Sequence, residues 1–178
     1  MKKLVLLLSL VFLFVGCTEK ETPSKKAEAF FASYQTLDTE VIDQLNKTVS
    51  EDDSLDTNSK DKYIEIMKKH YSNLKYNIKD ELIDGDDATV TVEIEVYDYT
   101  NILKNAEKYM NENKEQFNDE NGTFSNQLFT NYRLEQMEKV NETITYTLKL
   151  SLTRIDKEWI IDDLSSSDFM KIQGIYNN

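Results

Sequence analysis

Few side chains in this sequence have the chemistry of an active site. The chain of 178 residues contains one histidine, His70, and one cysteine, Cys17. Its four glycines are scattered, which excludes a Gly-rich phosphate loop, and no Gly-x-Ser-x-Gly segment occurs. A single cysteine cannot form a disulfide within the chain or a cysteine-cluster metal site. The sequence therefore predicts no metal, nucleotide or other cofactor.

His70 is the first residue to consider for proton transfer, because an imidazole titrates near neutral pH. It follows a helical pattern that places Tyr63, Met67 and Leu74 on the same face. General acid–base catalysis would need a positioned partner, and the sequence identifies none. We therefore expect a packed or rim histidine, favoured by the helix dipole near the C-terminal end of its helix. His70 is kept as a pocket candidate.

Two aspartates could place a carboxylate inside the fold. Asp80 and Asp98 lie at the alternate positions that the apolar residues occupy in their expected strands, so both side chains could face inward. A carboxylate buried in this way would have a raised pKa. Asp80 lies near the end of its strand, and Asp98 or Thr100 can cap the helix that follows. We favour these structural roles and keep Asp98 as a second pocket candidate. The segment 54–65 has the length of a calcium loop but lacks its first acid and its glycine, so no metal site is expected.

The N-terminal segment has the pattern of an export signal. Two lysines precede an apolar run over residues 4–15 that Ser9 alone interrupts. About a dozen residues are too few to span a bilayer, which needs roughly 20. The ordinary signal peptidase is disfavoured, because the bulky Phe14 would lie three residues before a cut behind Gly16.

The segment Phe14-Val15-Gly16-Cys17 resembles the lipobox of bacterial lipoproteins, in which a diacylglycerol thioether forms on the cysteine before cleavage ahead of it. Gly16 and Cys17 fit that pattern, whereas Phe14 replaces its usual Leu, Val or Ile. The resemblance implies a signal peptide over residues 1–16 and cleavage between Gly16 and Cys17. Cys17, carrying acyl chains such as palmitate, would hold the protein on the extracytoplasmic face of the cell membrane. Two acyl chains make that attachment stable.

The mature chain would be strongly acidic. The sequence has 33 acidic and 21 basic side chains, a net charge of −12, and removal of residues 1–16 takes away two lysines and no acid, giving −14. Such a charge repels nucleic acid, and no basic stripe interleaved with aromatic residues reverses it locally. We therefore expect no nucleic-acid partner and explain the acidity by solubility at a crowded surface.

Residues 17–24 form an expected tether, and residues 25–178 an expected single domain. Pro23, the only proline, lies in the tether, which has no large apolar residue. Thr22 with Pro23, or Ser24, would cap the first helix of the domain.

Helical and strand periods alternate along the domain. Asp38 could restart the first helical pattern, which allows one bent helix or two short ones, and Ser59 introduces the next helix. Asp84-Gly85-Asp86-Asp87 and Asp156-Lys157 supply turns between strands. The expected elements are helical patterns over 30–49 and 63–74, strands from Tyr76 and over 88–96, helical patterns over 101–119 and 128–140, strands over 144–152 and 159–163, and a weak helix over 168–176.

The order helix, helix, hairpin, helical insertion, hairpin gives an α+β domain with helices packed on one face of a curved antiparallel sheet. With the segments 84–92 and 154–161, this order resembles the cystatin-like or NTF2-like domains of small bacterial lipoproteins, whose sheet closes into a cone. The resemblance spans roughly residues 25–175 and rests on turns and strand patterning, so it implies a fold more than an activity.

Three classes of function follow. The first is a non-catalytic binding module near the membrane, for an envelope protein, a peptide or a small ligand. The second is an isomerase-like enzyme that uses His70 or Asp98 in the cone cavity, as other members of the resembled fold do. The third is a structural or assembly lipoprotein of the cell envelope. We favour the first and expect no enzyme, because no base, orienting partner and charge stabiliser converge in the sequence.

Replacing the cysteine of the lipobox tests the anchor. We expect Cys17→Ala to carry no lipid, because the thiol is the acceptor of the diacylglyceryl group, and Thr18→Ala to be modified as wild type is. Labelling of growing cells with a radioactive fatty acid measures both variants. Label on the Cys17→Ala protein would show that the anchor has been misidentified.

Overall fold

The computed structural model describes residues 21–177. The expected signal peptide, its cleavage site at Gly16 and the acceptor Cys17 lie outside the described residues, as do residues 18–20 of the expected tether. Within residues 21–177, no helix has both the length and the apolar composition that a bilayer crossing requires.

Two short helices open the domain. α1 (Pro23–Thr36) is capped by Thr22, whose hydroxyl accepts a backbone amide at 3.2 Å. Leu37 then adopts a left-handed conformation with a φ of 54°, and the carboxylate of Asp38 caps α2 (Thr39–Ser50). The first helical pattern is therefore two helices rather than one bent helix.

The third helix, α3 (Thr57–Asn73), begins earlier than expected. The carboxylate of Asp56 accepts the amide of Ser59 at 2.8 Å and is the cap. Ser59, which was expected to introduce the helix, instead lies buried in its first turn. The error arises because aspartate and serine are both strong cap residues and the intervening segment is polar throughout.

Four antiparallel strands form one sheet in the order β1-β2-β3-β4. They are β1 (Lys75–Asp84), β2 (Asp87–Tyr97), β3 (Thr143–Ile155) and β4 (Glu158–Ile161). Every second side chain of β2 from Ala88 to Val96 is at most 6% exposed, so the predicted alternation is confirmed. The fold is α+β, with helices packed on a curved antiparallel sheet, as the sequence predicts.

A bulge in β1 changes which side chains face the core. Ile78 lies opposite Val92, but the register then shifts and Asp80 lies opposite Thr91. Thr91 belongs to the outer face of β2, so Asp80 is exposed and its expected inward parity is wrong. Leu82 shares this outer face and is 67% exposed.

The two hairpin turns differ in backbone conformation. Gly85 has a φ of +64° as the first central residue of the β1–β2 turn. Asp156 and Lys157 have φ values of 50° and 75° in the β3–β4 turn, where both central residues are left-handed. That conformation matches the twist of a two-residue hairpin but is unfavourable for residues with a Cβ.

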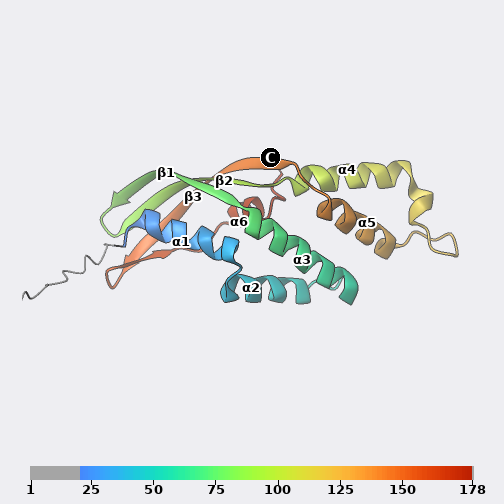
Figure 1. Cartoon of the computed structure of the whole chain (residues 1–178), viewed down its shortest axis with the longest axis horizontal. Coiled ribbons are helices and arrows are strands. Elements are labelled where there is room, and N and C mark those ends of the chain that lie inside the picture. The colour runs from blue at the N-terminus through green and yellow to red at the C-terminus, as the bar shows by residue number, and fades with distance from the viewer. Residues whose placement is uncertain (1–20, 178) are drawn as a thin grey trace, which may run out of the picture.

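A helical hairpin is inserted between β2 and β3. It consists of α4 (Tyr99–Glu112), a short 3-10 helix η1 (Lys114–Phe117) and α5 (Asn126–Glu138). Figure 1 shows α4 and α5 side by side, projecting beyond one end of the sheet. An aromatic cluster holds the far end of this hairpin: the rings of Tyr109 and Tyr132 stack at 5.1 Å, and both contact the buried Phe117.

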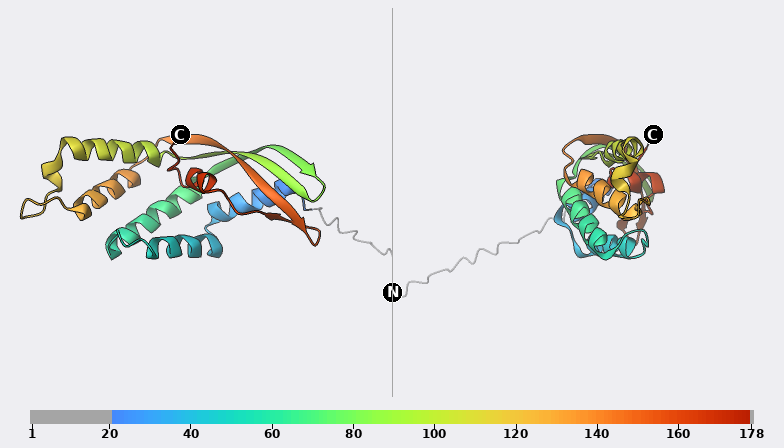
Figure 2. Two further views of the ribbon diagram at one scale, coloured as in Figure 1. Left: turned by 180° about the vertical axis from the view of Figure 1, so that it is seen from behind. Right: turned by 90° about the vertical axis from the view of Figure 1, so that its right-hand side faces the viewer.

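The core lies between the sheet and the helices α1 and α3 (Figure 2). α1 contacts β1, β2 and β4, so the sheet curves around it. α3 contacts β2, and α6 (Ser166–Ile172) follows β4. The fully buried side chains come from helices and strands alike and include Phe31, Met67, Leu74, Val90, Val92, Ile94, Leu148, Leu150, Leu152 and Ile172.

Trp159 gives a test of this packing. The Trp159 side chain is 4% exposed, and the guanidinium of Arg154 lies 5.1 Å from its ring centroid. We expect Trp159→Ala to lower the free energy of unfolding by about 3–5 kcal/mol, as large-to-small core substitutions do. Urea denaturation measures the loss. Ile160→Ala is the control, because Ile160 is 44% exposed and should matter much less; a loss below about 1 kcal/mol for Trp159→Ala would mean that the ring is not part of the core.

Candidate functional site

His70 lies in the core and not at a cavity rim. Its side chain is fully buried, and its Nε2 donates to the carbonyl oxygen of Ile172 at 2.8 Å. The ring stacks on Tyr99 at 4.9 Å between centroids and meets Tyr71 edge-on at 5.7 Å. From the end of α3, His70 therefore contacts both the start of α4 and the C-terminal segment.

The buried ring is neutral. Burial lowers the pKa of His70 from 6.5 to about 4, and the hydrogen bond to the Ile172 carbonyl opposes that shift only in part. The expected contribution of the helix dipole does not apply, since a neutral imidazole carries no charge for the dipole to stabilise. Packing, rather than electrostatics, explains the position of His70.

At Gly174 the C-terminal segment packs directly against His70. It has a φ of +70°, and a Cβ there would collide with the carbonyl oxygen of Tyr97 and press on Cε1 of His70. Thr100 donates its amide to the Gly174 carbonyl at 3.0 Å. Glycine is required here both for its conformation and for the close approach of the backbone.

Asp98 has the structural role that we favoured from the sequence. Its Oδ1 accepts the amide of Asn101 at 2.9 Å and caps α4. Asp98 and His70 are therefore not brought together as an acid and a base. Among residues 21–177, no group of three or more His, Cys, Asp or Glu side chains is placed to hold a metal ion.

Tyrosines fill the space between the helices and the sheet. Burial raises the pKa of Tyr34 to about 12 and that of Tyr71 still further, so both phenols stay neutral. A void of about 20 Å³ beside them, also lined by Gln173, has room for roughly one water molecule. This part of the interior cannot receive a substrate without repacking.

A groove lies at the side of the fold. An open groove of about 940 Å³ runs between α1, the start of α2, β4 and α6. We call it the acidic groove. Partly exposed apolar side chains on its walls include Phe30, Ile161, Leu164 and Phe169.

Four carboxylates give the acidic groove its charge. Asp38, Glu40, Asp162 and Asp163 line it, and within residues 21–177 none of them forms an ion pair. The one lysine on its wall, Lys26, pairs with Glu21 at 3.5 Å. The groove is therefore an anionic surface with apolar walls.

Sequence reasoning did not find this groove. Its residues come from two segments, 26–44 and 160–169, that lie more than 100 residues apart in the chain, and each acid taken alone is typical of a solvated surface. Asp162-Asp163 followed by Leu164 is the one local signal, since it places two carboxylates next to an apolar side chain. The expected strand over 159–163 includes both acids, whereas β4 ends before them at Ile161.

The burial of His70 predicts a specific pH dependence of stability. Below pH 6.5 the unfolded chain binds a proton on His70 that the native state does not bind until about pH 4. The free energy of unfolding should therefore fall by up to about 3 kcal/mol across this window through His70 alone. His70→Gln keeps an amide donor for the Ile172 carbonyl but does not titrate, so urea denaturation at pH 7 and pH 4 should show a smaller loss for the variant. Parallel pH profiles of the two proteins would contradict a neutral, buried His70.

The sequence matches no protein-family model and no curated protein. Its structure is similar to the crystal structure of "a putative lipoprotein (ycdA)" from Bacillus subtilis subsp. subtilis str. 168, with 14% sequence identity and a TM-score of 0.44. The similarity covers 89% of this chain and 51% of that one, so this chain spans about half the length of that protein. At these values the likeness identifies neither a family nor an activity, and the cystatin-like or NTF2-like assignment stays a prediction from the sequence.

Proposed function

We propose that this chain is a lipid-anchored protein of the extracytoplasmic face that works by binding, and that its acidic groove takes a basic segment of a partner polypeptide. The groove itself supports this proposal, because four carboxylates without an ion-pair partner among residues 21–177 lie beside partly exposed aromatic and aliphatic side chains. Two of them also accept hydrogen bonds within the fold: Asp38 caps α2, and Asp162 accepts the hydroxyl of Thr153 at 3.0 Å. A segment with lysine or arginine next to an apolar residue would match both features. A nucleic acid would be repelled by the same charges.

The state of His70 supports binding rather than catalysis. A general base must reach the proton that it removes, and the ring of His70 is buried with one nitrogen bonded to the Ile172 carbonyl. The carboxylate of Asp98 is engaged as a helix cap. The isomerase-like alternative would therefore need a different set of residues from those that the sequence suggested.

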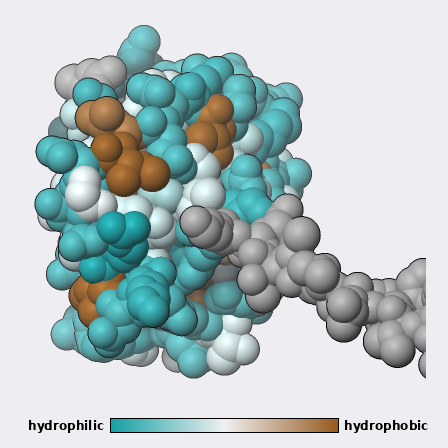
Figure 3. Space-filling view, turned by 90° about the vertical axis from the view of Figure 1, so that its left-hand side faces the viewer, coloured by the Kyte–Doolittle hydropathy of each residue, from teal (hydrophilic) through white to brown (hydrophobic). Residues whose placement is uncertain are grey.

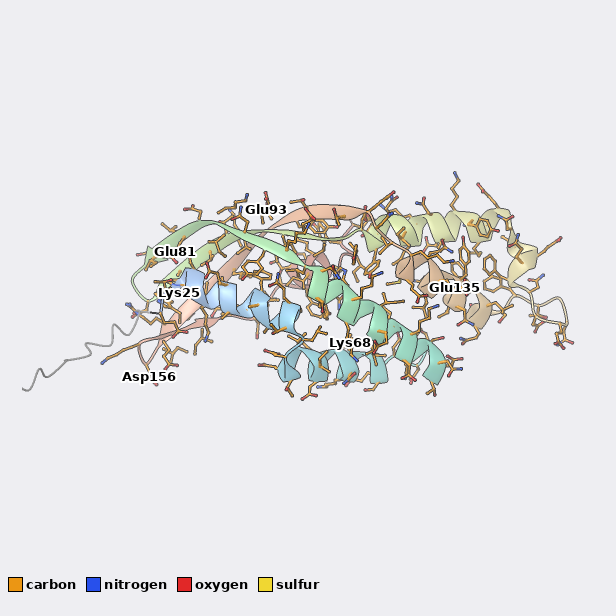
Figure 4. All side chains as sticks on the ribbon, viewed as in Figure 1. Lys25, Lys68, Glu81, Glu93, Glu135 and Asp156 are labelled. Atoms are coloured by element: carbon orange, nitrogen blue, oxygen red, sulfur yellow. The ribbon has the colours of Figure 1, made fainter. Side chains whose placement is uncertain are left out.

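The expected anchor would place the acidic groove near the membrane. Cys17 precedes Thr22 by five residues, which span at most about 17 Å when extended. Ser24 donates its amide to Glu81 at 2.7 Å, so the chain enters the domain beside the β1–β2 hairpin. Figure 4 labels Lys25, Glu81 and Asp156 at this end of the molecule and Glu135 toward the other end. A partner held in or near the same membrane would be within reach.

The surface at this end is compatible with a position close to lipid headgroups. Figure 3 shows separate apolar patches on a mostly hydrophilic face. Leu82, Ile83 and Ile155, at the tips of the two hairpins, are each at least 49% exposed. The patches are small and separated by charge, so we assign the attachment to the lipid on Cys17 and not to these side chains.

Crosslinking from inside the groove tests the proposal. A photoreactive amino acid at Gln44, which lines the groove, should give an adduct with a polypeptide in intact membranes. The same amino acid at Asn46, exposed on α2 outside the groove, is the matched control. Glu40→Lys with Asp163→Lys should lower the yield about tenfold or more, equivalent to about 1.4 kcal/mol of binding free energy.

Further controls separate charge in the groove from charge in general. Asp43→Lys changes an exposed acid of α2 that does not line the groove, and it should leave the adduct intact. Equal yields from Gln44 and Asn46, or no effect of the two charge reversals, would refute the groove as the partner site. Loss of biological function in a folded, anchored His70→Gln protein with intact crosslinking would instead favour an enzyme.

A further inference from the structure

The two arginines of this chain have opposite environments. Arg154 bonds Asp86 through Nε at 2.9 Å and through a second guanidinium nitrogen at 2.6 Å. Arg133, on α5, forms no ion pair with any residue of the range 21–177, and its Nε is buried without a hydrogen-bond partner. The Arg133 side chain is only half-buried, and its guanidinium lies 5.8 Å from the ring centroid of Phe129, so what it lacks among the described residues is an anionic partner.

Arg133 lies on the wall of a cleft of about 250 Å³ at the base of the helical hairpin. The cleft is formed by the end of α2 and the loop after it, by α3, α4 and α5, and by the C-terminal segment. Its residues do not overlap those of the acidic groove. Its apolar walls are Val49, Leu55, Leu103, Leu134, Met137 and Ile175.

The nearby acids do not neutralise Arg133. Asp52 also lines the cleft, but its carboxylate accepts the amide and hydroxyl of Ser54 at 2.9 and 2.6 Å. These hydrogen bonds lower the pKa of Asp52, which is the behaviour of a carboxylate already satisfied by its own loop. Glu135, labelled in Figure 4, follows Arg133 by two residues and so leaves α5 on a different side.

Tyr63 adds a neutral polar group to the cleft. Burial and the neighbouring Asp52 raise the pKa of Tyr63, while Arg133 lowers it, which places the phenol within the fields of both charges. A neutral phenol can donate to an anion that Arg133 binds.

From this arrangement the geometry points to a second binding site, in which Arg133 pairs with the carboxylate of a small monocarboxylate whose apolar body lies against Leu103, Leu134 and Ile175. A guanidinium fork matches a carboxylate, and the apolar walls match a short hydrocarbon chain. One negative charge neutralises Arg133. A dianion such as a phosphate monoester would leave an uncompensated charge beside Asp52, so it is disfavoured.

Titration of the full-length protein with hexanoate, followed by NMR, tests this site. Wild type should show saturable shifts of cleft residues. Arg133→Met keeps the apolar stem but removes the charge, and it should weaken hexanoate binding at least about tenfold, as loss of a charged hydrogen bond does. Hexanol has the same hydrocarbon body and no charge. It should therefore bind wild type about as weakly as hexanoate binds Arg133→Met. Arg154→Met is the matched control and should bind hexanoate as wild type does.

The following results would contradict the proposed site. Equal hexanoate affinity of wild type and Arg133→Met, or equal binding of hexanol and hexanoate, would overturn the role of the charge. Binding of leucine without binding of hexanoate would show that an ammonium group is required and overturn the assignment to a simple monocarboxylate. If Arg133→Met fails to fold, Leu55→Trp, which fills the cleft from its half-buried rim, should abolish binding and retain the fold.

Discussion

The apolar inner face of β2 and β3 is the constraint on which the rest of the fold depends. β2 has 11 residues and spans about 37 Å, whereas the 14 residues of α1 span about 21 Å. One helix cannot cover such a face. The remainder is covered by the end of α3 and by the C-terminal segment, which meet at His70 and Ile172. The buried histidine thus joins two covering elements whose sequences lie about 100 residues apart.

The acidic groove and the cleft at Arg133 lie where the elements that cover the sheet meet one another. The interior is filled by large side chains, including Phe31, Tyr71 and Tyr99. The acidic groove follows the junction of α1 with β4 and α6, and the cleft at Arg133 follows the junction of the helical hairpin with α2 and α3. Both share residues with the core, since Tyr34 lines the groove and Val49, Leu134 and Met137 line the cleft.

The sequence predicts the elements better than it predicts the sites. Strand alternation in β2 and β3 and the caps at Thr22 and Asp98 depend on neighbouring residues, and these expectations agree with the structure. The bulge that turns Asp80 outward is an irregularity of pairing with a second strand, which no local pattern records. Arg133 has the sequence context of an ordinary surface residue of a polar helix. Arg133 lines its cleft together with a loop more than 70 residues away in the sequence, so the sequence alone gives no reason to select it.

The contacts of residues 172–176 also determine when the core can be completed. Their carbonyl oxygens accept hydrogen bonds from His70, Thr100 and Tyr146, which belong to three separate elements. The core cannot close until this segment has left the ribosome. The inner face of the sheet is therefore fully covered only when α3, α4 and β3 have all met this one segment.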